Sequence, residues 1–291
     1  MRATRPRMTG FGAGTSRRMT DDSLDFSTSA RPLAVVTGAS SGIGRELALT
    51  FADHGFDVVA TAEDDAIAAV CPELQSRGVL ARCEQVDLAR PEGVEQLVHA
   101  ITATGRPVAA LAANAGIGVG GRFDQTDLDA DLRLIDLNVR SSVHLIKLVL
   151  RDMVRRGEGR ILVTASVVAA TPGPFHATYA ASKAFLHSFA EALHHELDDS
   201  GVTVTSLMPG PTETEFFERA GMQDTKVGSS DSKDDPAEVA RQGYDALMSG
   251  KDRVIAGSRM NRVQVAAGNT LPDSAGASAA AKMAKPGSGK S

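Results

Sequence analysis

Two side chains in the segment HATYAASKAF, residues 176–185, have types and a spacing that could move a proton. Tyr179 and Lys183 are four residues apart, and residues four apart on a helix lie on the same face. Free tyrosine has a pKa of about 10, but a nearby ammonium group stabilises the phenolate and lowers that pKa. Such a tyrosine can exchange a proton with an alcohol or ketone oxygen. The same pair also occurs on ordinary helix surfaces, so the rest of the chain must decide.

A glycine-rich segment, TGASSGIG at 37–44, lies where a phosphate could bind. It follows an apolar run, LAVVT at 33–37, that is typical of a buried strand, and it leads into a segment with helical spacing, 43–55. Between a strand and a helix, backbone N–H groups and the helix N-terminus can bind a pyrophosphate. Gly38 permits the turn and Gly42 lets the backbone approach the phosphate. The sequence therefore predicts a dinucleotide site here.

Acidic residues follow the second expected strand, DVVAT at 57–61, in the segment ATAEDD at 60–65. A carboxylate at Glu63 can accept a hydrogen bond from a ribose 2′-hydroxyl and would repel a 2′-phosphate. This favours NAD over NADP. The acids could also favour the start of the helix that they precede. Arg45, directly after the glycine-rich loop, is the nearby cation that could favour NADP instead.

Short apolar runs alternate with longer amphipathic runs from residue 33 onward. This alternation predicts an α/β fold, a parallel sheet with helices on both faces. We expect one domain over 31–270, a disordered leader over 1–30 and a flexible tail with at most one short helix over 271–291. The expected strands are 33–37, 57–61, 79–87, 108–114, 160–166, 202–208 and 253–257, and the expected helices are 43–55, 64–78, 91–105, 127–156, 175–199 and 235–250.

Composition excludes several classes of protein. The net charge of −5 argues against a nucleic-acid-binding protein. No apolar run reaches the roughly 18 residues that a membrane span needs. Cys71 and Cys83 are not spaced as metal ligands, so we expect no metal and two buried thiols in a cytoplasmic protein.

Several motifs occur together in one order along the chain. They are TGASSGIG, VDL at 86–88, NAG at 114–116, LNV at 137–139, Ser166 at 13 residues before Tyr179, YAASK, and PGPTET at 209–214. In this combination the sequence resembles the short-chain dehydrogenase/reductase family, in its compact single-domain form, over about residues 33–257. The resemblance implies a Rossmann-like, doubly wound parallel sheet of about seven strands in the order 3-2-1-4-5-6-7.

The resemblance also implies a role for each matching residue. Tyr179 would be the general acid/base, Lys183 would lower its pKa and bind the nicotinamide ribose, and Ser166 would orient the substrate oxygen. Asn138 would help to hold a water that relays protons to Lys183. The cofactor would be held by Gly38, Ser40, Ser41, Gly42, Ile43, Glu63, Asp87, Leu88, Asn114, Ala115, Gly116, Tyr179, Lys183, Pro209, Gly210, Thr212 and Thr214.

Two positions depart from the family pattern. Ala165 stands where relatives often have a second serine, but the spacing to Tyr179 still selects Ser166. Ala62 occupies the usual NAD-selecting acidic position, and Glu63 falls where NADP-binding relatives often have a basic residue. Glu63 still disfavours NADP, so NAD is the expected cofactor, with NADP as the alternative.

The leading functional hypothesis is an NAD(P)-dependent oxidoreductase that acts on a secondary alcohol or ketone. The alternatives are a non-catalytic dinucleotide-binding scaffold or sensor, and a reductase of 3-ketoacyl chains bound to an acyl carrier. The segments 171–177 and 215–234 should form the substrate walls, and His176 could line the pocket but is expected to be structural. Relatives commonly form homodimers or homotetramers through the two long helices, here 127–156 and 175–199.

Overall fold

The computed structural model describes residues 25–270 and 272–289. The described chain forms a seven-stranded parallel sheet in the order β3-β2-β1-β4-β5-β6-β7, which confirms the expected topology. β1 pairs with both β2 and β4, so the strand order reverses between β1 and β4. The strands are β1 (Leu33–Thr37), β2 (Asp57–Ala62), β3 (Ala81–Gln85), β4 (Val108–Ala113), β5 (Gly159–Thr164), β6 (Val202–Pro209) and β7 (Arg253–Ala256).

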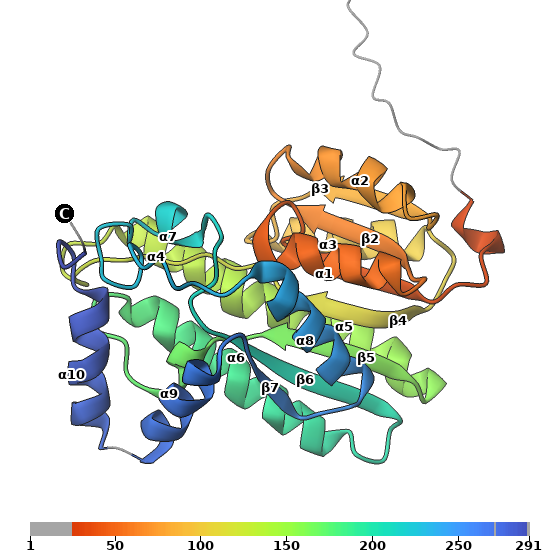
Figure 1. Ribbon diagram of the computed structural model, residues 1–291. Helices are drawn as coiled ribbons and strands as arrows, with labels where there is room; N and C mark the ends of the chain where they lie inside the picture. The colour runs from red at the N-terminus through yellow and green to blue at the C-terminus, as the bar shows by residue number, and fades with distance from the viewer. Residues whose placement is uncertain (1–24, 271, 290–291) are drawn as a thin grey trace, which may run out of the picture.

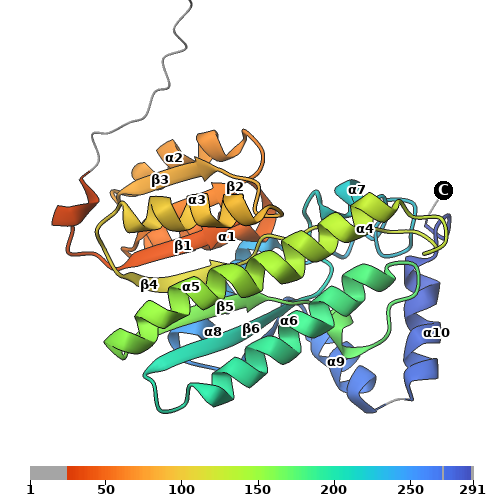
Figure 2. The same ribbon diagram turned by 180° about the vertical axis from the view of Figure 1, so that it is seen from behind.

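Helices cover both faces of the sheet (Figures 1 and 2). One face carries α1 (Gly42–Asp53), α2 (Ile67–Gln75) and α8 (Pro236–Met248). The other carries α3 (Pro91–Thr102), α5 (Ser141–Arg156) and α6 (Ala177–Glu196). Because successive side chains of a strand point to opposite faces, Val35 packs on the second face and its neighbour Val36 on the first. Every residue of β1 and β2 is buried, which explains their apolar runs.

The long helix expected over 127–156 is divided by a π-helical turn. α4 (Leu128–Ile135) begins after Asp127, whose side chain accepts a hydrogen bond from the Ala130 N–H. The π turn η2 (Asp136–Arg140) follows, and α5 continues from it. Asn138 lies within this turn, and π turns frequently mark functional positions.

The end of the expected leader is part of the domain. Residues 1–24 lie outside the described residues, but the 3₁₀ turn η1 (Phe26–Thr28) is capped by Asp25. Phe26 is buried in the core, and the Ser29 hydroxyl donates to the buried Asp57 carboxylate at 2.5 Å. The expected boundary at residue 30 is therefore too late. Burial of one phenylalanine stabilises the fold by about 1.5–3 kcal/mol. The polar composition of residues 1–30 as a whole does not reveal such a single buried side chain.

The segment expected to be a flexible tail contains a helix that packs on the domain. α9 (Arg259–Thr270) follows β7, and α10 spans Asp273–Ala284. The Val227 N–H donates to the Met283 carbonyl at 3.1 Å, and the Gly289 N–H donates to the Asp224 carbonyl at 2.7 Å. The Ala-rich composition that suggested mobility also has high helix propensity. Within the described ranges, no helix has the length and apolar character of a transmembrane span.

Candidate active site

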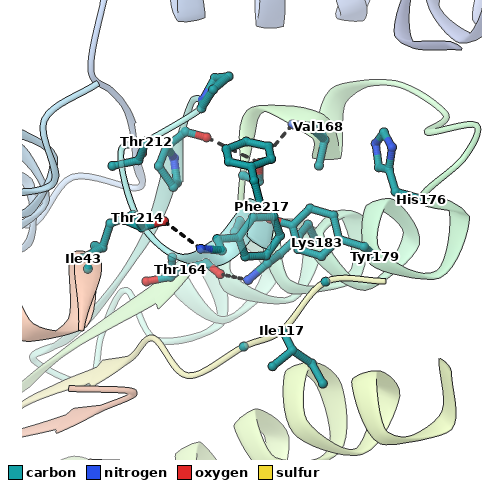
Figure 3. A pocket seen from close by; sticks show the side chains of 18 of the residues that line it. Ile43, Ile117, Thr164, Val168, His176, Tyr179, Lys183, Thr212, Thr214 and Phe217 are labelled. Atoms are coloured by element: carbon teal, nitrogen blue, oxygen red, sulfur yellow. Dashed lines mark hydrogen bonds between the residues drawn. The ribbon is translucent and has the colours of Figure 1, made fainter. Parts of the chain in front are cut away.

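A pocket of about 590 Å³ opens at the carboxyl ends of the central strands. It runs from the loop between β1 and α1 to the N-terminal part of α6 (Figure 3). Pockets of α/β sheets lie at this edge, where the strand order reverses. The lining includes all the predicted site residues except Asp87 and Asn138: Gly38, Ser40, Ser41, Gly42, Ile43, Glu63, Leu88, Asn114, Ala115, Gly116, Ser166, Tyr179, Lys183, Pro209, Gly210, Thr212 and Thr214.

The loop after β1 has the backbone conformation that a phosphate site requires. Gly38 and Gly42 have φ angles of +66° and +54°, which side-chain-bearing residues rarely adopt. A Cβ at Gly42 would lie 2.8 Å from Thr214 Cγ2, so only glycine fits there. Ser41 precedes α1 without a side-chain cap hydrogen bond. The N–H groups of the first helical turn therefore have no side-chain cap and face the pocket end where an anion would bind.

Hydrogen bonds hold the two strand ends together beside this loop. The Thr37 hydroxyl oxygen accepts from the N–H groups of Asn114 and Ala115 at 3.0 and 2.9 Å. The Asn114 amide donates to the Thr37 carbonyl at 3.1 Å, and the Thr164 hydroxyl donates to Asn114 Oδ1 at 3.1 Å. The end of β5, which precedes Ser166, is thus tied to the phosphate loop through Asn114.

Tyr179, Lys183 and Ser166 meet at the other end of the pocket. The Lys183 ammonium donates to the Thr164 carbonyl at 2.8 Å and lies 5.8 Å from the centre of the Tyr179 ring (Figure 3). Ser166 precedes the 3₁₀ turn η3 (Val167–Ala170), and its hydroxyl oxygen accepts from the Val168 N–H at 3.3 Å. Ser166 thus lies between β5 and η3, and Tyr179 and Lys183 lie on α6.

Burial dominates the pKa values of Tyr179 and Lys183. It raises the pKa of Tyr179 to about 12, and a hydrogen bond with Ser166 acts in the opposite direction without overcoming it. Burial therefore sets the net direction of the Tyr179 pKa, and the expected lowering by Lys183 stays a prediction. Burial also lowers the pKa of Lys183 to about 8. At neutral pH the phenol carries its proton and the lysine is mostly charged.

Asn138 lies behind the pocket wall. Its side chain accepts from the Ile117 N–H at 2.9 Å and donates to the Ile117 carbonyl and the Ser182 hydroxyl, both at 3.0 Å. A Cβ at Gly116 would lie 3.0 Å from Asn138 Oδ1 and 3.4 Å from the Lys183 ammonium. Asn138 thus holds the loop segment 116–117 beside the lysine. Its part in a water relay stays a prediction.

Glu63, which follows β2, and Asp87, which follows β3, are both paired with Arg133. Glu63 forms an ion pair with Arg133 of α4, and Arg133 also donates to both oxygens of Asp87 at 3.1 Å. Burial alone would raise the pKa of Asp87, but hydrogen bonds from Arg133 and the Ala89 N–H hold it below its usual value. Asp87 faces Arg133 and does not line the pocket. Its predicted contact with the cofactor therefore has no support from the pocket lining.

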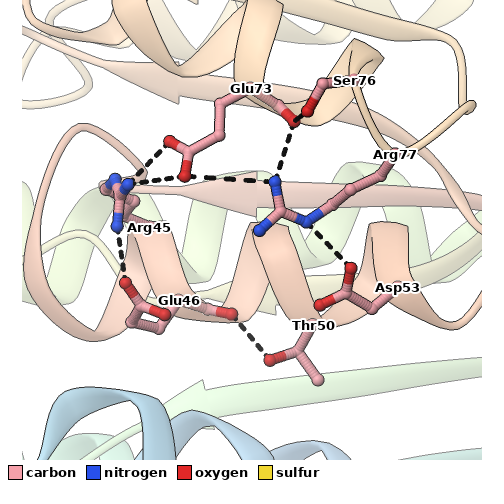
Figure 4. Close-up of polar contacts among 7 residues, drawn as sticks. All are labelled: Arg45, Glu46, Thr50, Asp53, Glu73, Ser76 and Arg77. Carbon is pink, nitrogen blue, oxygen red and sulfur yellow. Dashed lines mark hydrogen bonds and ion pairs between the residues drawn. The ribbon is translucent and has the colours of Figure 1, made fainter.

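Arg45 is turned away from the pocket. Figure 4 shows its guanidinium between the carboxylates of Glu46 and Glu73, each 2.6 Å away. It is absent from the pocket lining, so it is not placed to bind a 2′-phosphate. Asp64 instead comes into the site, because the Ser40 hydroxyl donates to Asp64 Oδ2 at 2.9 Å.

Apolar side chains dominate the substrate end of the pocket. Phe216 of α7 (Phe216–Arg219) has its ring 5.0 Å from that of Tyr179, and Phe217 and Met222 also line the pocket while packing in a small cluster. The two phenylalanines therefore both line the pocket and pack against neighbouring apolar side chains. α9 and α10 add a wall that the sequence did not predict, made of Met260, Gln264, Ala267, Gly268, Gly276, Ala279, Ala280, Met283 and Ala284.

Known proteins match most of the segments that build this pocket. Residues 32–225 match the family model described as short chain dehydrogenase. The chain is 33% identical over 217 residues to an uncharacterised oxidoreductase of Staphylococcus saprophyticus, a match that covers 74% of this chain and 90% of that protein. The chain belongs to the short-chain dehydrogenase/reductase family.

Solved structures of the family show the same fold. A short-chain dehydrogenase from Sphingobium yanoikuyae in complex with NADPH is 31% identical, with a TM-score of 0.72 over 77% of this chain and 87% of that chain. A protein assigned as an NAD(P)-dependent gluconate 5-dehydrogenase, from Beutenbergia cavernae with bound NADP, is 30% identical, with a TM-score of 0.67 over 79% of this chain and 96% of that chain.

Proposed function

We propose that this short-chain dehydrogenase/reductase is an NAD(P)-dependent oxidoreductase that interconverts a secondary alcohol and a ketone. The observation that carries the proposal is the convergence of Ser166, Tyr179 and Lys183 at one end of a pocket whose other end is the glycine-rich loop. The family match and the nicotinamide nucleotides in the two solved relatives support it.

The residues around the loop fit a dinucleotide. The positive φ angles of Gly38 and Gly42, and the closeness of Gly42 to Thr214, leave a cradle that a Cβ would fill. The start of α1 and the Ser40 hydroxyl would bind the pyrophosphate, Glu63 the ribose next to adenine, and Lys183 the other ribose. When bound, the nicotinamide would supply or accept the hydride.

The protein groups handle the proton and the substrate oxygen. Ser166 and Tyr179 would donate hydrogen bonds to the carbonyl oxygen, which orients the ketone and favours negative charge on that oxygen. Tyr179 would then donate its proton to the oxygen as the alcohol forms. The Lys183 ammonium would stabilise the phenolate that remains. Since burial keeps the Tyr179 phenol protonated, we propose that the free enzyme is prepared for ketone reduction.

The test compares cofactor binding with turnover. NADH and NADPH are titrated separately by nicotinamide fluorescence, and a panel of apolar ketones is then assayed with the tighter-binding nucleotide. Binding together with reduction supports the proposal. A scaffold or sensor predicts binding without turnover, and a carrier-dependent reductase predicts turnover only of carrier-bound 3-ketoacyl chains. Absence of binding by either nucleotide would contradict the oxidoreductase proposal.

Cofactor preference should depend on the ion pair between Glu63 and Arg133. Glu63→Ala removes the carboxylate that disfavours a 2′-phosphate and leaves Arg133 without this partner. We propose that the unaltered protein prefers NADH and expect the variant to shift the ratio of dissociation constants by about tenfold or more towards NADPH. Glu73→Ala is the matched control, because it releases Arg45 outside the pocket. An unchanged ratio in Glu63→Ala would show that Glu63 does not select the cofactor.

The rate of ketone reduction should fall as the pH rises through about 8, the pKa to which burial lowers Lys183. Below that pKa the ammonium is present and stabilises the developing phenolate, and above it the charge is lost. We expect kcat/KM to decline up to tenfold per pH unit between pH 8 and 10. Lys183→Met should give a slower rate without this inflection. An identical inflection in Lys183→Met would assign it to another group.

Homo-oligomer formation stays a prediction. The two long helices expected to pair between subunits direct Leu145, Ile146 and Leu186 into the core of the single chain. Within the described residues, the large apolar side chains exposed on these helices are Leu128, Leu132 and Ile135 of α4, Val154 of α5 and Phe185 of α6. If the protein is a dimer or tetramer, we propose that these residues contribute to the interface.

A further inference from the structure

An arginine of α7 lines the pocket and has no part in the function proposed above. Arg219 is the last residue of α7, and its side chain is 52% exposed. Its guanidinium lies 3.8 Å from the Asp64 carboxylate, and Asp64 Oδ2 accepts from the Ser40 hydroxyl of the glycine-rich loop at 2.9 Å. The Arg219 side chain is therefore an accessible cation that only one side chain, that of Asp64, separates from the loop.

The segment that leads into α7 packs directly on the glycine-rich loop. A Cβ at Gly42 would lie 2.8 Å from Thr214 Cγ2, and Figure 3 shows Thr214 beside Ile43, the next residue of α1. The Thr214 hydroxyl oxygen accepts from the Phe216 N–H, at the start of α7, at 3.3 Å. Because α7 spans only four residues, Arg219 at its end stays close to the loop.

The charges of the pocket lining make this arginine important for an anionic ligand. Among the described residues of the lining, the acids are Glu63, Asp64 and Glu215, and the basic side chains besides His176 are Lys183 and Arg219. Lys183 lies at the catalytic end of the pocket, beside Tyr179. A dinucleotide places two negatively charged phosphates at the loop, where Asp64 and Glu215 would repel them. Arg219 is the cation of this lining that can offset the repulsion.

Arg219 keeps hydrogen-bond donors for a ligand. A guanidinium has five N–H donors in a planar fork that matches the oxygens of a phosphate. The Arg219 side chain donates to Glu215, four residues earlier, whereas its contact with Asp64 at 3.8 Å is longer than a hydrogen bond. Exposed ion pairs of this kind stabilise a protein little, so a phosphate can replace them as the partner of the guanidinium.

We propose that Arg219 binds a phosphate group of the nicotinamide nucleotide, which is then held between the glycine-rich loop and α7. The inference rests on the proposed function, because it takes the nucleotide to lie along the loop. Two phosphates have the chemistry that a guanidinium recognises. They are the pyrophosphate, which NADH and NADPH share, and the 2′-phosphate of NADPH.

Removal of the guanidinium gives a direct test. Dissociation constants of NADH and NADPH are measured by nicotinamide fluorescence, and that of ADP-ribose by calorimetry. We expect Arg219→Met to weaken binding by about tenfold or more, the effect of charge-assisted hydrogen bonds to a phosphate. Arg219→Lys should recover part of the loss, because the charge remains while the planar fork is removed.

The chain offers a closely matched control in Arg241 of α8. Its side chain is 55% exposed and pairs with acids three residues earlier and four residues later, but it does not line the pocket. Arg241→Met should leave all three dissociation constants unchanged. Thermal melting shows whether a loss of binding in Arg219→Met reflects unfolding, and the partial loss in Arg219→Lys decides if it does.

The pattern of losses identifies the phosphate. Equal losses for NADH, NADPH and ADP-ribose in Arg219→Met assign the guanidinium to the pyrophosphate, and a loss confined to NADPH assigns it to the 2′-phosphate. Unchanged dissociation constants in a folded Arg219→Met, or equal losses in Arg241→Met, overturn the role of Arg219 even if the unaltered protein reduces ketones. Binding that depends on Arg219 in a protein that reduces no ketone supports this role and contradicts the oxidoreductase. If the unaltered protein binds none of the three ligands, both are overturned.

Discussion

Tyr179→Phe will lower kcat for ketone reduction by about a hundredfold to ten-thousandfold, the range of general acid catalysis by one side chain. The substitution removes the phenol, whose pKa burial raises to about 12, and keeps the ring that packs 5.0 Å from Phe216. The proton then has no donor at the carbonyl oxygen. Nucleotide binding should change by less than about threefold, because Lys183 and the glycine-rich loop are intact. Steady-state kinetics and fluorescence titration measure the two effects.

The chain supplies an unusually good control, because it has only two tyrosines. Tyr244 of α8 packs with Phe51 and His54 at ring-centre distances of 5.3 and 4.2 Å, away from the pocket lining. Tyr244→Phe makes the same chemical change and should leave kcat unaltered. If both variants lost activity equally, or if Tyr179→Phe kept full activity, Tyr179 would not be the proton donor.

A larger side chain on the pocket wall formed by α10 should change which substrates the enzyme accepts. Ala280 lines the pocket, so Ala280→Phe places a large side chain where a bulky ketone would lie. Forcing a bulky ketone against the added ring should cost about 1–3 kcal/mol, as overpacking of a protein core does. This corresponds to a loss of roughly fivefold to a hundredfold in kcat/KM for the bulky ketone. A small ketone such as 2-butanone should keep its kcat/KM within about threefold, because it does not reach α10.

Two further variants make this expectation specific. Ala275→Phe adds the same side chain to an exposed position of α10 that does not line the pocket, and it should have no effect. Deletion of residues 271–291 should raise KM for the bulky ketone while the nucleotide dissociation constant stays constant. Equal losses for small and bulky ketones in Ala280→Phe would show that α10 is not a substrate wall.

The predicted parts of the site are those that local sequence determines. Gly38 and Gly42 are needed where a strand turns into a helix, so their positions follow from the strand and helix pattern. Tyr179 and Lys183 are related by helix geometry alone. The order of the strands and the position of Ser166 followed from the family resemblance, since pattern alone does not distinguish neighbouring strands.

What the sequence missed depends on contacts between distant segments. The ion pair between Glu63 and Arg133 joins residues that are 70 positions apart. The sequence near either residue does not predict it. The raised pKa of Tyr179 reflects burial by the surrounding pocket walls, which the four-residue spacing to Lys183 cannot convey. His176 Nδ1 is buried without a hydrogen-bond partner among residues 25–270 and 272–289, which only the packed structure reveals.

The wall formed by α10 lies beyond residues 32–225, the part that matches the family model. One part of the pocket wall, α10, is therefore encoded in a different stretch of the gene from Ser166, Tyr179 and Lys183, the residues proposed to transfer the proton. Insertions, deletions or recombination in the last stretch can alter selectivity without disturbing the residues that carry out the reaction. Grafting this stretch between homologues offers a way to make reductases with exchanged substrate ranges and a common catalytic core.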